Sequence, residues 1–203
     1  MRKTSTTSQR RMEKGAKADA IWKAKVLAPS LTARLGSTPA TRFRGNPDVF
    51  GRLVEDHDRH RALIAMIEET RGKSPLRRKL FRELVREVKS HAAAEEQALW
   101  STVLRNPDTT DDARHAVAEH KQLDDLLADL AARDMASSAW LRRFEKMKEK
   151  YLHHIREEEQ EQFVAAQNHL RPADTRYMRG VFSRRKKAEK AQVKIEKKIK
   201  LKG

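Results

Sequence analysis

The 203-residue sequence predicts an all-α protein, namely an up-down-up-down antiparallel four-helix bundle that is followed by a fifth, C-terminal helical segment. The first observation is that apolar residues recur every three or four positions along four long segments, as they do on one buried face of a helix. The second is that short segments rich in Pro, Gly, Asn or Ser separate these four segments. Because short loops make successive helices antiparallel neighbours, the two observations favour a bundle.

The first helix is predicted over residues 46–71 and the second over residues 74–104. Both segments begin with a capping residue followed by proline, an arrangement typical of helix starts. Gly72 is expected to end the first helix, since glycine is common just past a helix C-terminus. Only a short loop then separates the two helices.

The third helix is predicted over residues 110–133, after a turn made by Asn106, Pro107 and Asp108. The fourth is predicted over residues 138–169, with two serines at its start. Both segments keep the apolar spacing of a buried face, so each is expected to contribute one side of a common core.

Pro172 opens a last segment, in which residues 173–185 keep some apolar spacing and predict a short helix packed on the bundle. The chain then divides into a basic, largely disordered arm over residues 1–45, a bundle domain over residues 46–185 and a lysine-rich tail over residues 186–203. The tail is compatible with a basic, weakly amphipathic helix or with a solvated extension.

The positive charge of the chain is concentrated at its two ends. Of the net charge of +16, residues 1–52 carry +9 (12 Lys/Arg and 3 Asp/Glu) and residues 171–203 carry +10 (13 and 3), whereas residues 53–170 carry −3 (20 and 23). Basic ends of this kind bind nucleic acid or another polyanion non-specifically, or serve solubility alone. No recognition motif accompanies them, so the sequence does not predict specific reading of bases.

Composition excludes several classes of protein. The chain has no cysteine, which excludes disulfides, zinc–thiolate sites, iron–sulfur clusters and thiol catalysis. No apolar run approaches the roughly 20 residues that span a membrane, and the basic start lacks the apolar segment of a secretory signal. A cytoplasmic location is therefore expected.

Four histidines and two glutamates form a repeated pattern. The interval from His57 to His91 equals the interval from His120 to His154, and the second pair repeats the first at a fixed offset along the chain. A glutamate stands four residues after the second histidine of each pair, which places both side chains on one helix face. All six fall on the predicted buried faces, where an unpaired carboxylate costs several kcal/mol unless a cation binds it. The six candidate metal ligands are His57, His91, Glu95, His120, His154 and Glu158.

This pattern resembles the bacterial-type HHE cation-binding domain of the hemerythrin superfamily. The resemblance covers about residues 48–187, and an aromatic residue also follows each glutamate pair. The matching motifs are Asp56-His57, His91-x3-Glu95-Glu96, Glu119-His120 and His154-x3-Glu158-Glu159. The resemblance implies a bundle that holds two non-haem iron ions bridged by carboxylates, and a centre that meets a small oxidant such as O2, peroxide or nitric oxide.

One departure from the oxygen-carrying members limits the functional prediction. Those proteins use a fifth histidine four residues before another on the third helix, where this chain has Ala116. Fewer protein ligands leave metal positions open, which favours sensing, iron binding or peroxide chemistry over reversible oxygen carriage. The sequence therefore predicts binding of, or response to, a small oxidant. It leaves open a peroxide-decomposing or nitric-oxide-consuming enzyme on the same centre, and a polyanion-binding protein that acts through its basic ends.

Further residues near the predicted ligands remain ambiguous at this point. His60 is a fifth ligand, a proton donor or a core histidine, and Tyr151 either hydrogen-bonds a ligand of the metal or packs in the core. Glu96 and Glu159 lie about 100° round the helix from the predicted ligands and are expected to orient an imidazole or to face solvent. The remaining histidines are expected at the surface; they are His115, His153 and His169.

Overall fold

The computed structural model describes residues 41–71 and 74–195, and every regular element in those ranges is helical. The all-α prediction is therefore confirmed. The predicted disordered arm up to residue 40 and the tail from residue 196 lie outside the described residues. The helical elements are α3 (Val49–Glu68), α4 (Pro75–Glu95), η1 (Glu96–Trp100), α5 (Ser101–Val103), α6 (Pro107–Ala131), α7 (Ser138–Glu157), η2 (Glu158–Gln162), α8 (Phe163–Asn168) and α9 (Pro172–Gln192).

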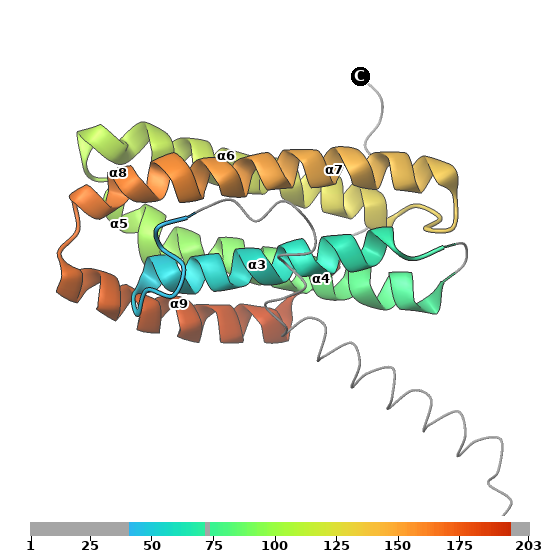
Figure 1. Ribbon diagram of the computed structural model, residues 1–203, viewed down its shortest axis with the longest axis horizontal. Coiled ribbons are helices and arrows are strands. Elements are labelled where there is room, and N and C mark those ends of the chain that lie inside the picture. The colour runs from blue at the N-terminus through green and yellow to red at the C-terminus, as the bar shows by residue number, and fades with distance from the viewer. Residues whose placement is uncertain (1–40, 72–73, 196–203) are drawn as a thin grey trace, which may run out of the picture.

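The long helices lie lengthwise along the long axis of the molecule (Figure 1). Helix α3 packs against α4, α6 packs against α7, and α9 packs against both α3 and α4. Short connections join the successive rods at the two ends. None of the described helices combines the length and the apolar character that a membrane crossing requires.

Side chains that accept hydrogen bonds from the first helical turn fix the start of each rod. Ser74 accepts from the N–H of Arg77 at 3.2 Å, as expected at the start of α4. The first helix, however, begins at Val49 rather than at residue 46, because Asp48 is the residue that caps it. The third begins at Pro107 rather than near residue 110, since the residues predicted as a turn instead form the cap and first turn of α6.

Gly51, in the first turn of α3, lies where the preceding loop folds back onto the helix. A Cβ atom at this position would stand 2.0 Å from the carbonyl oxygen of Asn46 and 2.8 Å from its carbonyl carbon. Backbone atoms do not yield as the end of a flexible side chain does. The close approach therefore requires glycine.

We expect Gly51→Ala to lower the free energy of unfolding by about 2 kcal/mol, because the clash must be relieved by shifting backbone. For a chain of this size that corresponds to a fall in Tm of roughly 4–8 °C, measured by circular dichroism. Gly180→Ala is the matched control, since its Cβ would meet only the end of the Arg184 side chain at 3.3 Å. An equal loss in both variants would contradict this account.

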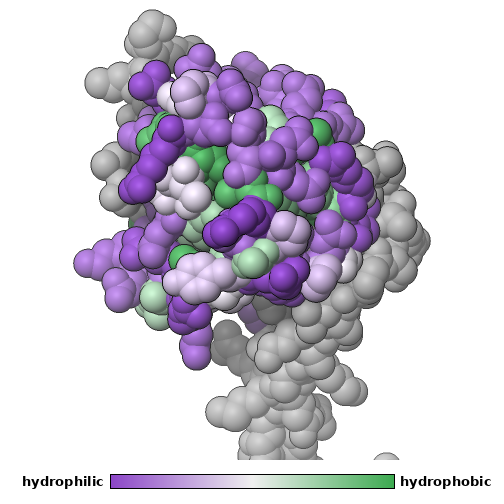
Figure 2. Space-filling model, turned by 90° about the vertical axis from the view of Figure 1, so that its left-hand side faces the viewer, coloured by the Kyte–Doolittle hydropathy of each residue, from purple (hydrophilic) through white to green (hydrophobic). Residues whose placement is uncertain are grey.

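The core consists of two apolar clusters, one toward each end of the bundle. One cluster contains Leu63 of α3 together with Leu84 of α4 and Leu127 of α6. The other contains Phe50 of α3, Leu99 of η1 and Phe163 of α8. Hydrophilic side chains cover much of the end that carries α5 and α8, and apolar ones show between them (Figure 2). Along the chain, all six predicted ligands fall between residues of the first cluster and residues of the second, so the bundle holds a buried polar layer between two dry ones.

The sequence predicted that the second and fourth rods are continuous α-helices, but both are interrupted. Each contains one π-helical turn, η1 directly after Glu95 and η2 beginning at Glu158. In each turn a backbone N–H reaches five residues back, from Ser101 to Glu96 and from Phe163 to Glu158. A π turn inserts one residue into the helical repeat and changes the direction of the side chains around it, and such turns are frequent at functional sites.

Helix α9 is longer than the short segment predicted over residues 173–185 and continues to Gln192. Its Lys186 is buried and contacts Asp56 at 2.5 Å and Glu87 at 2.6 Å, while Lys190 contacts Glu83 at 2.7 Å. These lysines, which the sequence analysis assigned to a solvated or weakly amphipathic tail, instead hold the helix against α3 and α4. The helix is longer than predicted because these lysines form ion pairs with acids of other helices, and composition alone does not reveal such pairs.

Candidate metal centre

Four different rods contribute imidazoles to the polar layer. His57 comes from α3, His91 from α4, His120 from α6 and His154 from α7, and all four are buried. The glutamates are fully buried as well; they are Glu95 at the end of α4 and Glu158 at the start of η2. The structure thus brings together all six side chains that the sequence singled out.

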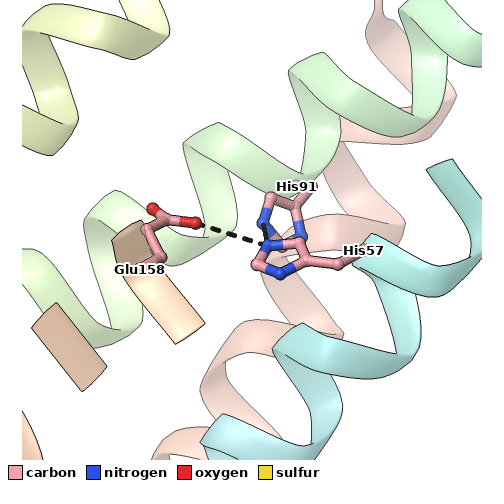
Figure 3. A group of neighbouring side chains, drawn as sticks. All are labelled: His57, His91 and Glu158. Atoms are coloured by element: carbon pink, nitrogen blue, oxygen red, sulfur yellow. Dashed lines mark hydrogen bonds and ion pairs between the residues drawn. The ribbon is translucent and has the colours of Figure 1, made fainter. Parts of the chain in front are cut away.

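The first group of ligand atoms lies between α3, α4 and η2. The Nε2 atoms of His57 and His91 face each other at 3.1 Å, and the Glu158 carboxylate lies 3.4 Å from the Nε2 atom of His57 (Figure 3). One donor atom from each of these three buried residues lies within 4.8 Å of the other two. The spacing suits a single cation between them.

A second group of the same kind lies between α6, α7 and η2. It consists of His120, His154 and again Glu158, whose Oε1 atom is 3.9 Å from Nε2 of His120 and 3.4 Å from Nε2 of His154. Glu158 therefore belongs to both groups. Glu95 spans them too, because its Oε2 atom lies 3.4 Å from His91 and 3.5 Å from His120. Two carboxylates thus lie between two pairs of imidazoles.

A carboxylate from a neighbouring rod holds the other ring nitrogen of every imidazole. Nδ1 lies 2.8 Å from Glu159 in His57, 2.9 Å from Glu96 in His120, 2.8 Å from Glu119 in His154 and 3.3 Å from Asp56 in His91. The four carboxylates are themselves related by the same offset along the chain as the histidines, Asp56 with Glu119 and Glu96 with Glu159. The layer therefore has approximate twofold character.

The orienting role of Asp56 and Glu119 was not predicted, although both residues belong to the recognised motifs. Each stands directly before a predicted ligand, yet each reaches the histidine of a different rod, His91 and His154 respectively. The repeat could have revealed this role, because Asp56 and Glu119 are separated by the same offset along the chain as the paired histidines. Of the two roles expected for Glu96 and Glu159, the structure shows the first: each contacts Nδ1 of an imidazole, Glu96 that of His120 and Glu159 that of His57.

These contacts indicate which tautomer each imidazole adopts when it is neutral. When Nδ1 of an imidazole donates its hydrogen to a carboxylate, Nε2 of the neutral ring carries a lone pair. The Nε2 atoms of His57 and His91 would then present two lone pairs to each other across 3.1 Å. Burial opposes protonation of His91, but Asp56 and Glu95 outweigh it and raise the pKa, so an added proton relieves that repulsion in the metal-free protein. A metal cation between the rings would take the place of that proton, and the neutral tautomers are those that a metal requires.

Several buried atoms of the layer lack a hydrogen-bond partner among the described residues. They include both oxygens of Glu95, both oxygens of Glu158 and Nε2 of His120. A buried acceptor without a donor costs about 1–3 kcal/mol, and more when it is charged. Oε2 of Glu95, both oxygens of Glu158 and Nε2 of His120 lie 3.4–3.9 Å from ligand atoms of the two groups, so the donor set fits a pair of cations.

The pKa values of the two buried glutamates are shifted in opposite directions. Burial raises the pKa of Glu158 well above its ordinary value, and the nearby Glu95 carboxylate raises it further. Burial also acts to raise the pKa of Glu95, but the imidazoles of His120 and His91 outweigh it, so that the pKa is lowered. Two carboxylates placed together cannot both be ionised cheaply unless positive charge accompanies them.

The histidines differ in a similar way. Burial lowers the pKa of His154 to about 4, so this imidazole is neutral near neutral pH. Burial also opposes protonation of His120, but Glu95 and Glu96 outweigh it and raise the pKa to about 9. The positive charge on His120 offsets the negative charge of the glutamates, a task that a bound cation would take over.

His60 and Tyr151 form a hydrogen-bonded pair beside the layer. The Tyr151 hydroxyl lies 2.5 Å from Nδ1 of His60, and both side chains are buried. Nε2 of His60 has no hydrogen-bond partner and belongs to neither group of ligand atoms within the described ranges. The rings of His60 and His91 are 5.2 Å apart, so the pair touches the polar layer from one side.

Comparison with known proteins agrees with this geometry. A family model described as the hemerythrin HHE cation binding domain matches residues 48–166, more than half of the chain. The chain belongs to this family. The predicted resemblance to HHE domains is thereby confirmed, and a cation-binding domain is established.

The fold of this hemerythrin-like chain is also found in a solved structure. A hemerythrin HHE cation binding domain-containing protein from Mycobacterium kansasii superposes with a TM-score of 0.63 and 20% sequence identity, covering 76% of this chain and 90% of that one. No curated protein matches the sequence. At this identity the likeness supports the helical fold and does not transfer a reaction.

Proposed function

We propose that the HHE domain holds two non-haem iron ions between His57, His91, Glu95, His120, His154 and Glu158, in an up-down-up-down bundle, and that it binds or responds to a small oxidant. One observation carries the proposal: the Nε2 atoms of two buried imidazoles face each other at 3.1 Å, beside carboxylates that have no hydrogen-bond partners among the described residues. Neutral imidazoles whose Nδ1 atoms donate to the orienting carboxylates leave those atoms unsatisfied, and a bound cation would satisfy them.

The donor set favours an iron-class metal. Imidazole nitrogen and carboxylate oxygen without thiolate suit iron, and paired carboxylates suit two ions. Two metal–ligand bonds of about 2.1 Å place their donor atoms about 3.0 Å apart at a right angle and about 3.4 Å apart at a tetrahedral angle, so the spacing fits a metal ion without selecting one. The separations from imidazole to carboxylate at the centre are 3.4 or 3.5 Å in four of five pairs.

The metal would supply electrons and a Lewis acid for a small oxidant. The residues of this chain would fix the ligands and exclude bulk water. Asp56, Glu96, Glu119 and Glu159 would keep each imidazole in the tautomer that presents Nε2. The Tyr151 hydroxyl is hydrogen-bonded to Nδ1 of His60 and would hold that ring beside the layer. Buried Ala116 stands where oxygen carriers have a further histidine, which supports sensing or peroxide chemistry over oxygen carriage.

A surface groove offers a route to the centre for a small oxidant. A hollow of about 530 Å³ between α4, α6 and the end of α9 is lined in part by Ala92, Glu96 and His120. His120 is thus the proposed ligand that borders solvent-accessible space, while Glu96, its hydrogen-bond partner, lies half in solvent. Small oxidants would approach the second group of ligand atoms through this groove.

We expect Ala92→Trp to slow the reaction of the loaded centre with azide or nitric oxide by about tenfold, equivalent to ~1.4 kcal/mol of barrier, because the indole narrows the groove. Stopped-flow absorbance measures the rate, and the iron content should not change. Ala128→Trp, which places the same side chain in a different groove, is the control. Equal rates in the two variants would show that the oxidant enters elsewhere.

Metal analysis tests the proposal directly. Protein purified aerobically is expected to carry about two iron ions per chain and to show near-ultraviolet charge-transfer bands of a bridged pair. His154→Ala should lose at least one of the ions and the bands with it. Metal-free protein with unchanged stability would reject the proposal.

Two alternative functions, a peroxide-decomposing enzyme and a polyanion-binding protein, can be tested by measuring peroxide turnover and the salt dependence of polyanion binding. Turnover of peroxide far above that of His154→Ala would favour an enzyme, whereas equal background rates would exclude one. Polyanion binding through the basic ends would have to weaken steeply with salt and disappear on deletion of residues 1–40 and 196–203, which spares the buried Phe43 and all of α9. Lys186 and Lys190 already contact carboxylates of the bundle, which reduces the charge that the C-terminal end offers to such a partner.

A further inference from the structure

A second set of histidines and glutamates lies at the surface between α6 and α7. His115 and Glu119 are four residues apart on α6, and His153 and Glu157 are four residues apart on α7. Both pairs have the histidine-to-glutamate spacing of the buried motifs. We call these four residues the rim cluster. From the sequence, His115 and His153 were each expected to lie at the surface, with no relation between them.

The rim cluster is connected through shared oxygen atoms. Oε2 of Glu157 lies 3.4 Å from His153 and 3.9 Å from His115, and Oε2 of Glu119 lies 3.6 Å from His115. One donor atom each from His115, Glu119 and Glu157 lies within 4.8 Å of the other two. These distances are longer than the donor–acceptor distance of a good hydrogen bond. They are close to the distance of about 3.4 Å that separates two donor atoms bound to one metal ion.

We propose that the rim cluster is a third cation site, which takes a divalent transition metal of the iron, zinc or manganese class and shares Glu119 with the buried centre. Imidazole and carboxylate donors define this class. His115 and His153 are 55% and 67% exposed, so solvent ions reach them freely. Glu119 is almost buried and holds Nδ1 of His154 at 2.8 Å, which places the rim ion one carboxylate away from a proposed ligand of the buried pair.

The cluster is open to solvent on the α7 side. His153 and Glu157 line a surface hollow of about 400 Å³ there, and the residues that line it come from α7 and η2 and not from α6. The nearest competing charge on Glu119 is Lys150, but it lies 3.8 Å from Oε1, the oxygen that does not face His115. Oε2 of Glu157 lies near both histidines of the cluster, whereas Oε2 of Glu119 lies 3.6 Å from His115 and also accepts from Nδ1 of His154 at 2.8 Å. A rim ion would therefore share this oxygen with His154.

Zinc titration of the protein as purified, with its buried centre loaded, tests the site. Equilibrium dialysis against Zn²⁺ should show one more bound ion in the parent protein than in the double variant His115→Ala/His153→Ala. Loss of partners outside the ligand shell costs about 10–100-fold in affinity, so removal of two ligands should weaken binding at least 100-fold. His169→Ala, which removes a surface histidine that lies near Asp108 instead, should bind like the parent.

Equal zinc counts in the parent and the double variant would overturn the proposal, and so would an equal loss in His169→Ala. The zinc count is a difference between two proteins with the same buried residues, so it holds whether or not the buried centre carries iron. Iron content, measured separately, should be unchanged in the double variant. As a second readout, Zn²⁺ should shift the imidazole NMR signals of His115 and His153 in the parent protein; unshifted signals would also refute the site.

Discussion

Glu158→Gln is expected to abolish cation binding at both buried groups, because Glu158 is the side chain that the two groups share among the described residues. An amide oxygen carries no charge and would not replace the carboxylate that the two proposed cations would share. Iron per chain should fall from about two to near background, with loss of the near-ultraviolet bands. A cation present at 1,000 times its Kd stabilises a protein by about 4 kcal/mol, so the loaded parent should exceed the variant in Tm by roughly 8–16 °C.

The same variant distinguishes a ligand from a structural residue. Without metal, Glu158→Gln should be at least as stable as the metal-free parent, since an amide replaces a fully buried carboxylate that has no hydrogen-bond partner among the described residues. Thermal denaturation after chelation measures this comparison. Glu161→Gln is the matched control, because it makes the same change on an exposed residue of η2 and should keep its iron. A metal-free Glu158→Gln protein that is much less stable than the parent would assign Glu158 to the fold instead.

Lys186→Met is expected to produce the largest loss of stability from a residue outside the metal centre. The variant leaves Asp56 and Glu87 without the buried ammonium that contacts both of them. Breaking one partner of a buried ion pair costs about 3–5 kcal/mol. We expect the lower figure, about 3 kcal/mol or roughly 6–12 °C in Tm, because Arg52 and Lys190 still contact the two carboxylates. Lys187→Met, on the exposed side of α9, is the control.

The pH dependence of this variant follows from Glu87. Burial acts to raise its pKa, but Lys186 and Lys190 outweigh burial and lower it from the ordinary value of 4.5. A carboxylate whose folded pKa is lowered stabilises the fold above its unfolded pKa, and that stabilisation is lost as the pH falls through the folded pKa. The difference in free energy of unfolding between the parent and Lys186→Met should therefore be constant at neutral pH and shrink below pH 4.5. A difference that grows in acid would contradict the pairing.

Lys186→Met also tests how α9 affects the metal centre. Oδ2 of Asp56 accepts hydrogen bonds both from Nδ1 of His91 and from Nζ of Lys186, so Lys186 fixes the carboxylate that orients His91. Loss of the lysine should weaken metal retention, measured by competition with a chelator, within the range of about 10–100-fold known for residues that orient ligands. The other half of the layer differs, because Glu119 there contacts Lys150 near the surface. The two metal positions are thus expected to be unequal.

Local spacing explains why so much of the site could be predicted. His91 and Glu95 are one helical turn apart, and so are His154 and Glu158; that adjacency follows from the geometry of the helix alone. The apolar residues on either side of each motif predicted that these faces are buried, and the repeat offset indicated that the four rods meet at one level. Family membership was read from the same residues. The all-α class needed no long-range information.

The parts that could not be predicted depend on how the rods approach and rotate. Asp56 stands beside His57 in the chain but contacts His91, because successive helical residues point about 100° apart and a neighbouring rod lies in that direction. The π turns after Glu95 and at Glu158 alter the side-chain directions by one residue, which the apolar spacing does not encode. The pairing of Lys186 with two acids likewise depends on where α9 docks.

By itself, the sequence determined the helical class, the family and the six residues that form the buried polar layer, because each of these depends on spacing along single helices. Only the tertiary structure decided that Glu158 faces both pairs of imidazoles, that four further carboxylates orient them, and that the two exposed histidines of the rim cluster lie across from each other. Those relations join residues on different rods, and the packing of the bundle sets them.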